Sequence, residues 1–174
     1  DLSLWNELDF SIDYFHEDRS GIFMQRRSIP STVGFADKLP YANIGKVKNM
    51  GVDMSLTYNK VIKKDVTLSL HGSFTYAHNE VVDKDEPSNV EPYYSEIGHP
   101  VNSLRGYIAE GLFTSQEEID NSPVQTLSQY TVGDIKYKDL NNDGKIDGND
   151  ITTIGNPEIP EIVYGFGGTL KWKK

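Results

Sequence analysis

VTLSLHGSFTYAH, residues 66 to 78, alternates apolar and polar side chains with a period of two. The even positions are Val66, Leu68, Leu70, Gly72, Phe74 and Tyr76, and the odd positions are Thr67, Ser69, His71, Ser73 and Thr75. Successive side chains of a strand point to opposite faces of a sheet. The stretch therefore predicts a β-strand with one apolar face and one polar face.

The same alternation recurs along the chain, in GVDMSLTYN, LDFSIDYFHED and IVYGFGGTLKW. Strands of ten or more residues exceed the five or six that are usual in globular proteins, and match the roughly ten-residue segments of transmembrane barrels. We expect one antiparallel sheet in meander order, in which the last strand pairs with the strand of VTLSLHGSFTYAH. The predicted strands cover residues 1–5, 8–18, 46–59, 66–80 and 161–173.

The connections between these strands differ in length according to the side of the sheet. Residues 5–7 and 60–65 are tight links, whereas 19–45 and 81–160 are long, polar and rich in Pro, Gly, Asn and Asp. The strand directions place both short links on one side and both long ones on the other. Short periplasmic turns and long extracellular loops are typical of outer-membrane barrels. The fold class that we predict is all-β, an antiparallel meander of long strands within a large transmembrane β-barrel.

Composition excludes several classes of protein. The 174 residues carry a formal charge of -9 and the pI is about 4.8, which argues against a nucleic-acid partner. The sequence holds no cysteine, so it has no disulfide scaffold and no thiolate metal site. Mean hydropathy is -0.51, and no apolar run approaches the length of a membrane-spanning helix. Barrel strands alternate and average out on such a scale, so an outer-membrane location is compatible with these values.

DLNNDGKIDGND, residues 139–150, has the spacing of a calcium-binding loop. Oxygen-bearing side chains fall at positions 1, 3, 5, 9 and 12, the backbone carbonyl of position 7 is a further ligand, and Gly144 supplies the sharp turn at position 6. An aspartate replaces the usual glutamate at position 12. We expect one structural Ca²⁺ here, although an Asn/Asp-rich surface turn without metal remains the alternative. The expected ligands are Asp139, Asn141, Asp143, Lys145, Asp147 and Asp150.

No catalytic constellation is evident in the sequence. The four histidines are scattered without a metal-ligand spacing, and FTSQEEIDNSP reads as a short helix with Ser115 as N-cap and Glu118 completing a capping box. We therefore expect no enzyme. A non-enzymatic extracellular β-sandwich that binds glycan or a partner protein and carries a dockerin-like calcium loop is the alternative to the barrel.

Four stretches resemble one family closely. They are DLSLWNELDFSIDYFHEDRSGIF (1–23), YANIGKVKNMGVDMSLTYN (41–59), EIGHPVNSLRGYIAEGLFTSQEEID (96–120) and VGDIKYKDLNNDGKIDGNDITTIGNPEIPEIVYGF (132–166). Their order and motifs are similar to the C-terminal part of the SusC-like TonB-dependent transporters of Bacteroidetes outer membranes. The matching residues are Gly98, Pro100, Gly106, Tyr107, Gly111, Leu112, Phe113, Gly133 to Ile146, Ile154, Gly155, Pro157 and Tyr164 to Phe166.

That resemblance implies a large single-chain barrel of the Gram-negative outer membrane with a plug domain inside it. It also implies a SusD-like surface lipoprotein as partner, oligosaccharides or peptides as cargo, and outer-membrane lipid around the barrel. The plug and the TonB box of the family are not in this sequence. We expect the chain to be a partial sequence whose missing N-terminal part engages the TonB complex.

Overall fold

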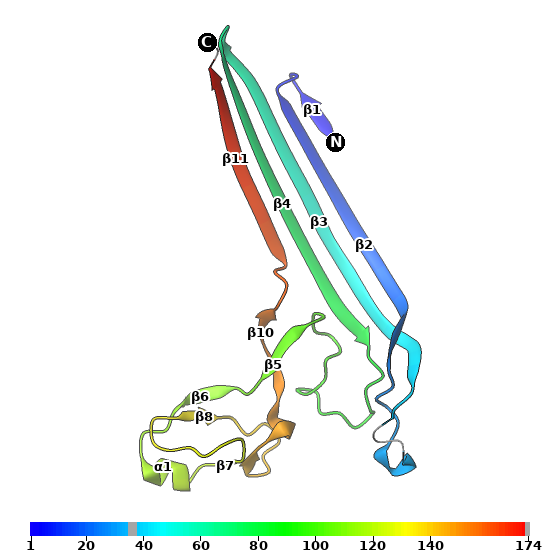
Figure 1. Ribbon diagram of the computed structural model, residues 1–174, viewed down its shortest axis with the longest axis vertical. Coiled ribbons are helices and arrows are strands. Elements are labelled where there is room, and N and C mark those ends of the chain that lie inside the picture. Colours follow the sequence, from blue (N-terminus) through cyan, green and yellow to red (C-terminus); the bar gives the residue numbers. More distant parts are fainter. Residues whose placement is uncertain (35–37, 173–174) are drawn as a thin grey trace.

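The computed structural model describes residues 1–34 and 38–172, and within these ranges it contains one five-stranded antiparallel sheet and three two-stranded pairings. The large sheet has the order β1-β2-β3-β4-β11 and forms a long inclined ribbon (Figure 1). Its strands are β1 (Leu2–Leu4), β2 (Leu8–Gln25), β3 (Tyr41–Lys63), β4 (Val66–Asp83) and β11 (Ile162–Trp172). The meander and the pairing of β11 with β4 are as predicted from the alternation.

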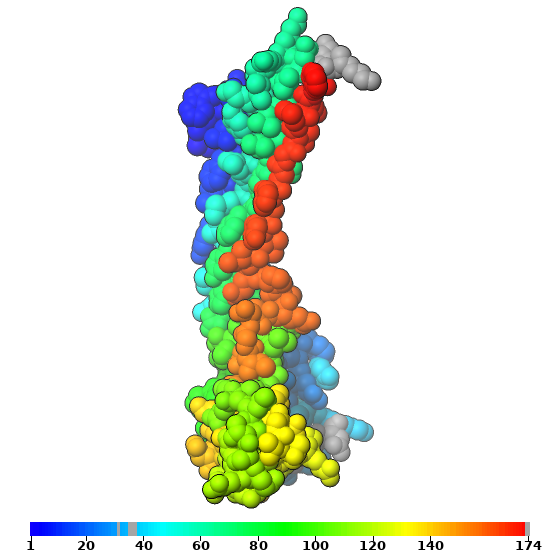
Figure 2. All heavy atoms as spheres, turned by 90° about the vertical axis from the view of Figure 1, so that its left-hand side faces the viewer, coloured from blue at the N-terminus to red at the C-terminus, as the bar shows by residue number. Residues whose placement is uncertain are grey.

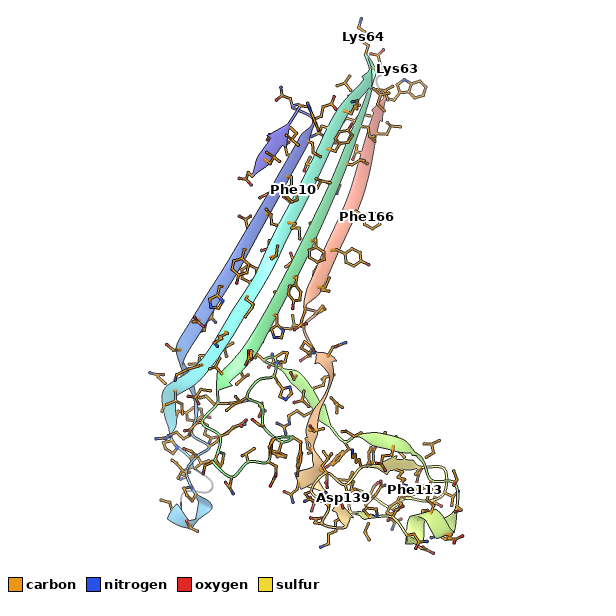
Figure 3. The ribbon with its side chains drawn as sticks, turned by 180° about the vertical axis from the view of Figure 1, so that it is seen from behind. Phe10, Lys63, Lys64, Phe113, Asp139 and Phe166 are labelled. Atoms are coloured by element: carbon orange, nitrogen blue, oxygen red, sulfur yellow. The ribbon has the colours of Figure 1, made fainter. Side chains whose placement is uncertain are left out.

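The tight turns lie together at one end of the sheet. Trp5 and Asn6 adopt positive φ angles of 54° and 52°, and the Glu7 amide closes that turn on the Leu4 carbonyl at 3.1 Å. The turn between β3 and β4 comprises only Lys64 and Asp65, so it is shorter than the link expected at 60–65. Figure 3 shows Lys64 at this tip, with Asp139 at the far end of the molecule.

The strand register places apolar side chains on one face of the sheet and polar side chains on the other. Tyr14, Val52, Tyr76 and Ile162 are in register, as are Ser11, Ser55, Ser73 and Gly165. The even-numbered rows form an apolar face and the odd-numbered rows a polar face, as predicted. The described residues place no second sheet over the apolar face, where the side chain of Phe166 is 86% exposed. The sandwich alternative requires that face to be packed against another layer, and the described residues supply none.

β2 and β3 continue well beyond the predicted strands. Residues 19–25 and 41–45 are strand, so only 26–40 connect β2 to β3 and the expectation of a loop over 19–45 was wrong. The reason is that the hydropathy alternation ends where charged rows begin, as at Asp18 and Lys48, while the backbone hydrogen bonds go on. Gly21, with a φ of 68°, lies in the bulge where the register shifts. At about 3.3 Å per residue, the 23 residues of β3 span roughly 75 Å, about two and a half times the hydrocarbon thickness of a membrane.

The segment between β4 and β11, residues 84–161, is folded, and we call it the cap. Sequence alone predicted a loop over 81–160 with one short helix. The cap instead contains β5 (Ser103–Gly106), β6 (Ala109–Leu112), α1 (Gln116–Asp120), β7 (Val124–Gln125), β8 (Ile135–Tyr137), β9 (Lys145–Ile146), a 3₁₀ turn (Gly148–Asp150) and β10 (Thr152–Pro157). A further 3₁₀ turn, Ser31–Val33, lies in the connection between β2 and β3.

A small core holds the cap together. Phe113, Ile146 and Asp150 are the largest fully buried side chains in the described residues, and all three belong to the cap. Phe113 directly follows β6 and Ile146 lies in β9, and Phe113 stacks on Tyr130 with ring centroids 5.5 Å apart. Seen from the side, a narrow sheet stands above this wider cap (Figure 2). No helix in the part of the chain that the structure describes is long and apolar enough to cross a membrane.

Candidate functional site

The acidic loop 139–150 is built from nested hydrogen bonds between side chains and nearby amides. Asp139 accepts the amides of Asn142 and Gly144 at 2.7 and 2.9 Å, and Gly144 has the positive φ, 82°, that its position in the pattern requires. Ile146 is fully buried and anchors the loop in the cap core, as expected from its apolar side chain. Other amides of the loop bind Asn141, Asp143, Asp147 and Asp150 in the same way.

The predicted metal ligands share one loop but are not focused on one point. Across residues 1–34 and 38–172, no three His, Cys, Asp or Glu side chains are grouped closely enough to hold a metal ion. Asp150 is fully buried, and its two carboxylate oxygens accept the amides of Leu140 and Asp147 at 2.8 and 2.9 Å. A calcium ion in this loop would therefore need the carboxylates to reorient from the geometry described here.

The loop is close enough to a neighbouring segment to affect its chemistry. The Tyr93 hydroxyl donates a hydrogen bond to the Asn149 carbonyl at 3.1 Å. Burial, followed by the negative charges of Glu91, Asp150, Asp139 and Asp143, raises the pKa of Tyr93.

The predicted helix is present as α1, with one difference in its capping. Ser115 is the N-cap and accepts the Glu118 amide at 3.2 Å. The Glu118 carboxylate does not return to the cap residue but accepts the amide and hydroxyl of Thr114 at 2.9 and 2.8 Å. These bonds from Thr114, with one from Lys136, lower the pKa of Glu118 to about 2.

The cap is joined to the β2–β3 connection through Asp85, which sequence reasoning did not identify. Its carboxylate accepts the amides of Arg27 and Ser28 at 2.9 and 3.2 Å, the Ser28 hydroxyl at 2.9 Å, and the Arg26 guanidinium at 3.3 Å. Burial alone would raise the pKa of Asp85, but the hydrogen bonds from Arg26, Ser28 and the Arg27 amide outweigh burial and hold that pKa at about 2.

Glu96 forms a second connection between these segments. Its carboxylate lies 2.8 Å from the Arg27 guanidinium and 3.7 Å from that of Arg105, and it is also paired with Lys84. Burial disfavours the charged form, yet Lys84 and Arg27 outweigh burial and lower the pKa of Glu96. Both junctions join residues more than 50 positions apart, so local sequence patterns gave no sign of them.

The start of the cap folds back over the polar face of the sheet. The Gly98 amide and the His99 carbonyl pair with the backbone of Val81, each at 2.9 Å. Asn79 is an odd-numbered residue of β4, and its side chain accepts the Val101 amide at 2.7 Å. Residues 98–101 therefore follow the edge of β4 and then turn over the same face as the serines and threonines.

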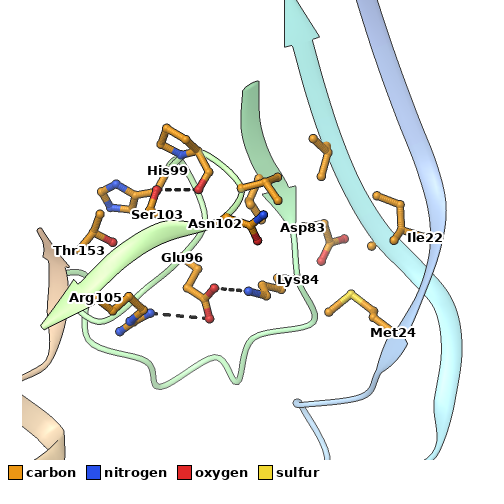
Figure 4. A pocket seen from close by; sticks show the side chains of 15 residues that line it. Ile22, Met24, Asp83, Lys84, Glu96, His99, Asn102, Ser103, Arg105 and Thr153 are labelled. Carbon is orange, nitrogen blue, oxygen red and sulfur yellow. Dashed lines mark hydrogen bonds and ion pairs between the residues drawn. The ribbon is translucent and has the colours of Figure 1, made fainter. Parts of the chain in front are cut away.

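A cavity of about 430 Å³ lies beneath this segment (Figure 4). A second hollow of about 340 Å³ adjoins it, because Ile22, Val47, Val101 and Asn102 line both. Together they form a groove between the cap and the polar face at the end of the sheet that is far from the tight turns. The first cavity is lined by Ile22, Met24, Gly45, Val47, Val81, Asp83, Lys84, Glu96, His99, Pro100, Val101, Asn102, Ser103, Arg105 and Thr153.

A sheet with one lipid-compatible face, one polar face and a folded cap at one end is the wall of a membrane β-barrel. The comparisons with known proteins agree. The model of the family "TonB dependent receptor-like, beta-barrel" matches residues 2–162, so this chain belongs to that family. Its members are β-barrels of the Gram-negative outer membrane, which places this chain there.

Individual relatives are distant but matched along the chain. TonB-dependent receptor P26 of Formosa agariphila is 26% identical over 99% of this chain, and the match covers 18% of the relative. TonB-dependent receptor SusC of Bacteroides thetaiotaomicron is 25% identical over 75% of this chain and is itself covered over 13%. The chain thus spans less than a fifth of the length of these receptors.

Solved structures share the fold. The RagAB peptide importer in its "open-open" state matches 97% of this chain and 17% of the solved chain, with a TM-score of 0.67 and 19% identity. The "closed-closed" state matches 96% of this chain and 18% of the solved chain, with a TM-score of 0.63 and 21% identity. At these identities the likeness concerns the fold.

Proposed function

We propose that the protein containing this chain is a SusC-type importer that moves oligosaccharides or peptides across the outer membrane. It acts as a transporter and not as an enzyme. The observation that carries this proposal is the separation of faces: four paired long strands put apolar rows on one side and Ser, Thr, Asp and Gly on the other. A polar face of small side chains lines a wet lumen, while the apolar face contacts lipid.

The partners that we propose follow from the similarity of this chain to SusC and from the fold that it shares with RagAB. A SusD-like surface lipoprotein would cover the extracellular mouth, where the cap lies, and the TonB complex would supply energy through an N-terminal part. Support comes from the SusC relative and from the fold shared with the RagAB peptide importer. In this arrangement the cap of residues 84–161 lies where cargo enters.

Uptake by whole cells tests the proposal. Cells that express the full-length protein should accumulate a fluorescent oligosaccharide pool or a fluorescent peptide pool, and a protonophore should abolish the accumulation. The control is the same strain carrying a deletion of the gene for the full-length protein. Uptake that is unchanged by the deletion would refute the importer.

We also propose that loop 139–150 takes one structural Ca²⁺. The support is the register of Asp139, Asn141, Asp143 and Asp150, the positive φ of Gly144 and the anchoring of Ile146. Once bound, the ion would supply a fixed centre of positive charge among these carboxylates. Ile146 would hold the loop against the cap core, beside Tyr93.

A further inference from the structure

The apolar face of the large sheet has a definite height. Its rows run along β4 from Val66 to Tyr76, and ten residue steps of about 3.3 Å cover roughly 33 Å of strand. With the tilt of about 45° that is usual for barrel strands, these rows reach a height of roughly 23 Å. The apolar band of an outer-membrane barrel is about 25 Å tall. We therefore expect the rows to fill the hydrocarbon layer, with lipid headgroups at both of their ends.

Charged side chains enter these rows only beside the tight turns. Among the paired residues of the described sheet that share these rows, the charged ones are Lys60 and Lys63. Lys63 is in register with Val66, which is in register with Trp172, so it belongs to the row nearest the turns. Lys60 belongs to the next row, with Leu68. Both lysines therefore lie at one edge of the apolar face, where the headgroups begin.

The lysines of this edge differ in how their charges are balanced. The Lys60 ammonium lies 2.9 Å from the Glu7 carboxylate, so these two charges compensate each other. Lys63 and Lys64 are exposed at the tip of the β3–β4 hairpin (Figure 3), and neither forms an ion pair with a carboxylate of residues 1–34 or 38–172. In a chain of net charge -9, this tip presents two adjacent positive charges that an external anion can balance.

Tryptophan side chains mark the same end of the sheet. Trp5 lies in the turn between β1 and β2, Trp172 ends β11, and each is 82% exposed. Tryptophan is enriched where a membrane meets water, because its ring is amphipathic. A lysine at that level extends its stem along apolar surface and places its ammonium group among the headgroups. A headgroup with a net negative charge suits such an ammonium group better than a zwitterionic headgroup, which brings a positive charge of its own.

We propose that the tip of the β3–β4 hairpin binds the phosphate of an anionic phospholipid through Lys63 and Lys64, with Lys60 and Trp172 beside the headgroup. The lipid belongs to the leaflet at the tight turns, which in an outer-membrane barrel is the periplasmic leaflet. β3 and β4 are inner strands of the sheet, so strands that adjoin its edges in the full-length protein leave the outer side of this hairpin open. The proposal goes beyond the importer function and requires only that the apolar face contacts lipid.

A photo-reactive benzophenone residue in place of Leu170 reports which lipid lies beside this edge. Leu170 is 65% exposed, shares the row of Lys60, and is not one of the proposed contacts. The full-length protein is reconstituted into vesicles of equal parts phosphatidylglycerol and phosphatidylethanolamine with the same acyl chains, and the cross-linked lipids are identified by mass. Each lysine near an anionic lipid surface strengthens binding about fivefold. Phosphatidylglycerol adducts should therefore exceed phosphatidylethanolamine adducts by about fivefold or more.

Substitution of the two lysines tests whether their charge causes the preference. Lys63→Gln combined with Lys64→Gln should bring the ratio of the two adducts close to one. Arginine at both positions keeps the charge and should keep the preference. The matched control combines Lys38→Gln with Lys138→Gln, which removes two charges from exposed lysines in the β2–β3 connection and the cap. Heat-modifiable mobility on gels confirms that each barrel has assembled.

A second benzophenone residue, in place of Ile162, reports on the opposite edge of the apolar face. Ile162 is 54% exposed and is in register with Tyr76, so it lies in the row farthest from the tight turns. Its ratio of adducts measures the preference of the barrel away from the proposed site. That ratio should stay the same in the glutamine, arginine and control variants.

The outcomes at position 170 decide the proposal. A preference for phosphatidylglycerol that the glutamine variant removes, and that the arginine variant and the control keep, supports the lipid site. Equal labelling of both lipids by the wild type, or a preference that survives the loss of both lysines, overturns it. Cross-links to another segment of the protein instead of lipid overturn it as well, because the edge is then covered. Cargo uptake by whole cells is a separate measurement, so failure of the importer function and failure of the lipid site are distinguishable.

Discussion

Asp85 illustrates how a single carboxylate organises the end of the sheet that carries the cap. It bridges the cap and the β2–β3 connection through two backbone amides, a hydroxyl and a guanidinium. Its partners lie 57 to 59 positions earlier in the chain, so the contact exists only once the meander has formed. No spacing rule applied to the sequence would find it, because the acidic residues of KDEP resemble any solvated turn.

The pH dependence of this junction follows from the pKa of Asp85. The folded pKa of about 2 lies below the ordinary value of 3.8, so folding favours the ionised carboxylate. The stability that Asp85 contributes is therefore complete above about pH 4 to 5 and is lost as pH falls toward 2. Hydrogen exchange of residues 26–34, corrected for intrinsic rates, should stay slow at pH 5 and accelerate below pH 4.

Asp85→Asn provides the control for that prediction, since it preserves size but cannot ionise. In this variant the exchange of residues 26–34 should be faster at pH 5 and should lose most of its dependence on pH between 5 and 2.5. Identical pH profiles in the variant and the wild type would show that Asp85 does not hold the junction.

At the scale of elements, side-chain alternation predicted the pairing of β2, β3, β4 and β11 because each strand has one lipid-compatible face. It did not predict where the strands end. Residues 19–25 extend β2 with RSGIFMQ, which has lost the alternation, although the backbone still pairs with β3. The short strands of the cap were missed for a related reason: two- to six-residue strands around Phe113 and Ile146 are too short to show a period.

The faces of β4 can be tested by charge substitution. Leu70 lies near the middle of the apolar rows that run from Val66 to Tyr76. We therefore expect it to face lipid near the centre of the bilayer. Leu70→Arg should destabilise the assembled barrel by about 2–4 kcal/mol. Ser69→Arg, on the polar face one residue away, should cost far less. Urea-dependent folding into lipid vesicles measures both, and equal costs would contradict the assigned register.

The acidic loop makes a separate prediction. Full-length protein should bind one Ca²⁺ with six to eight oxygen ligands at about 2.3–2.6 Å. Asp139→Ala and Asp143→Ala should each abolish binding and raise hydrogen exchange in 139–150, while the sheet stays folded because its hydrogen bonds do not involve the loop. Calorimetry measures the binding, with Asp120→Ala in α1 as the control. A crystal of the full-length protein grown in millimolar calcium with no ion in 139–150 would refute the prediction.

For the whole molecule, the sheet described here is one layer thick, and it leaves large apolar side chains such as Tyr164 and Phe166 more than two-thirds exposed, at 70% and 86%. Such a surface is unfavourable in water and favourable in a bilayer, where the apolar rows contact lipid chains. The opposite face carries the groove and the small polar residues. We therefore expect the apolar face of the sheet to contact lipid and the polar face to line the lumen, with the cap at one end of the sheet.

Accessibility of spin labels along β4 tests the assignment of one face of the sheet to lipid and the other to the lumen. The chain contains no cysteine, so single cysteines at positions 66 to 77 can be labelled in the full-length protein in outer-membrane vesicles once any cysteine elsewhere in that protein has been replaced. We expect a period of two, with oxygen accessibility highest at even positions and accessibility to a water-soluble nickel complex highest at odd positions. Uniform accessibility, or maxima of oxygen at the odd positions, would contradict it.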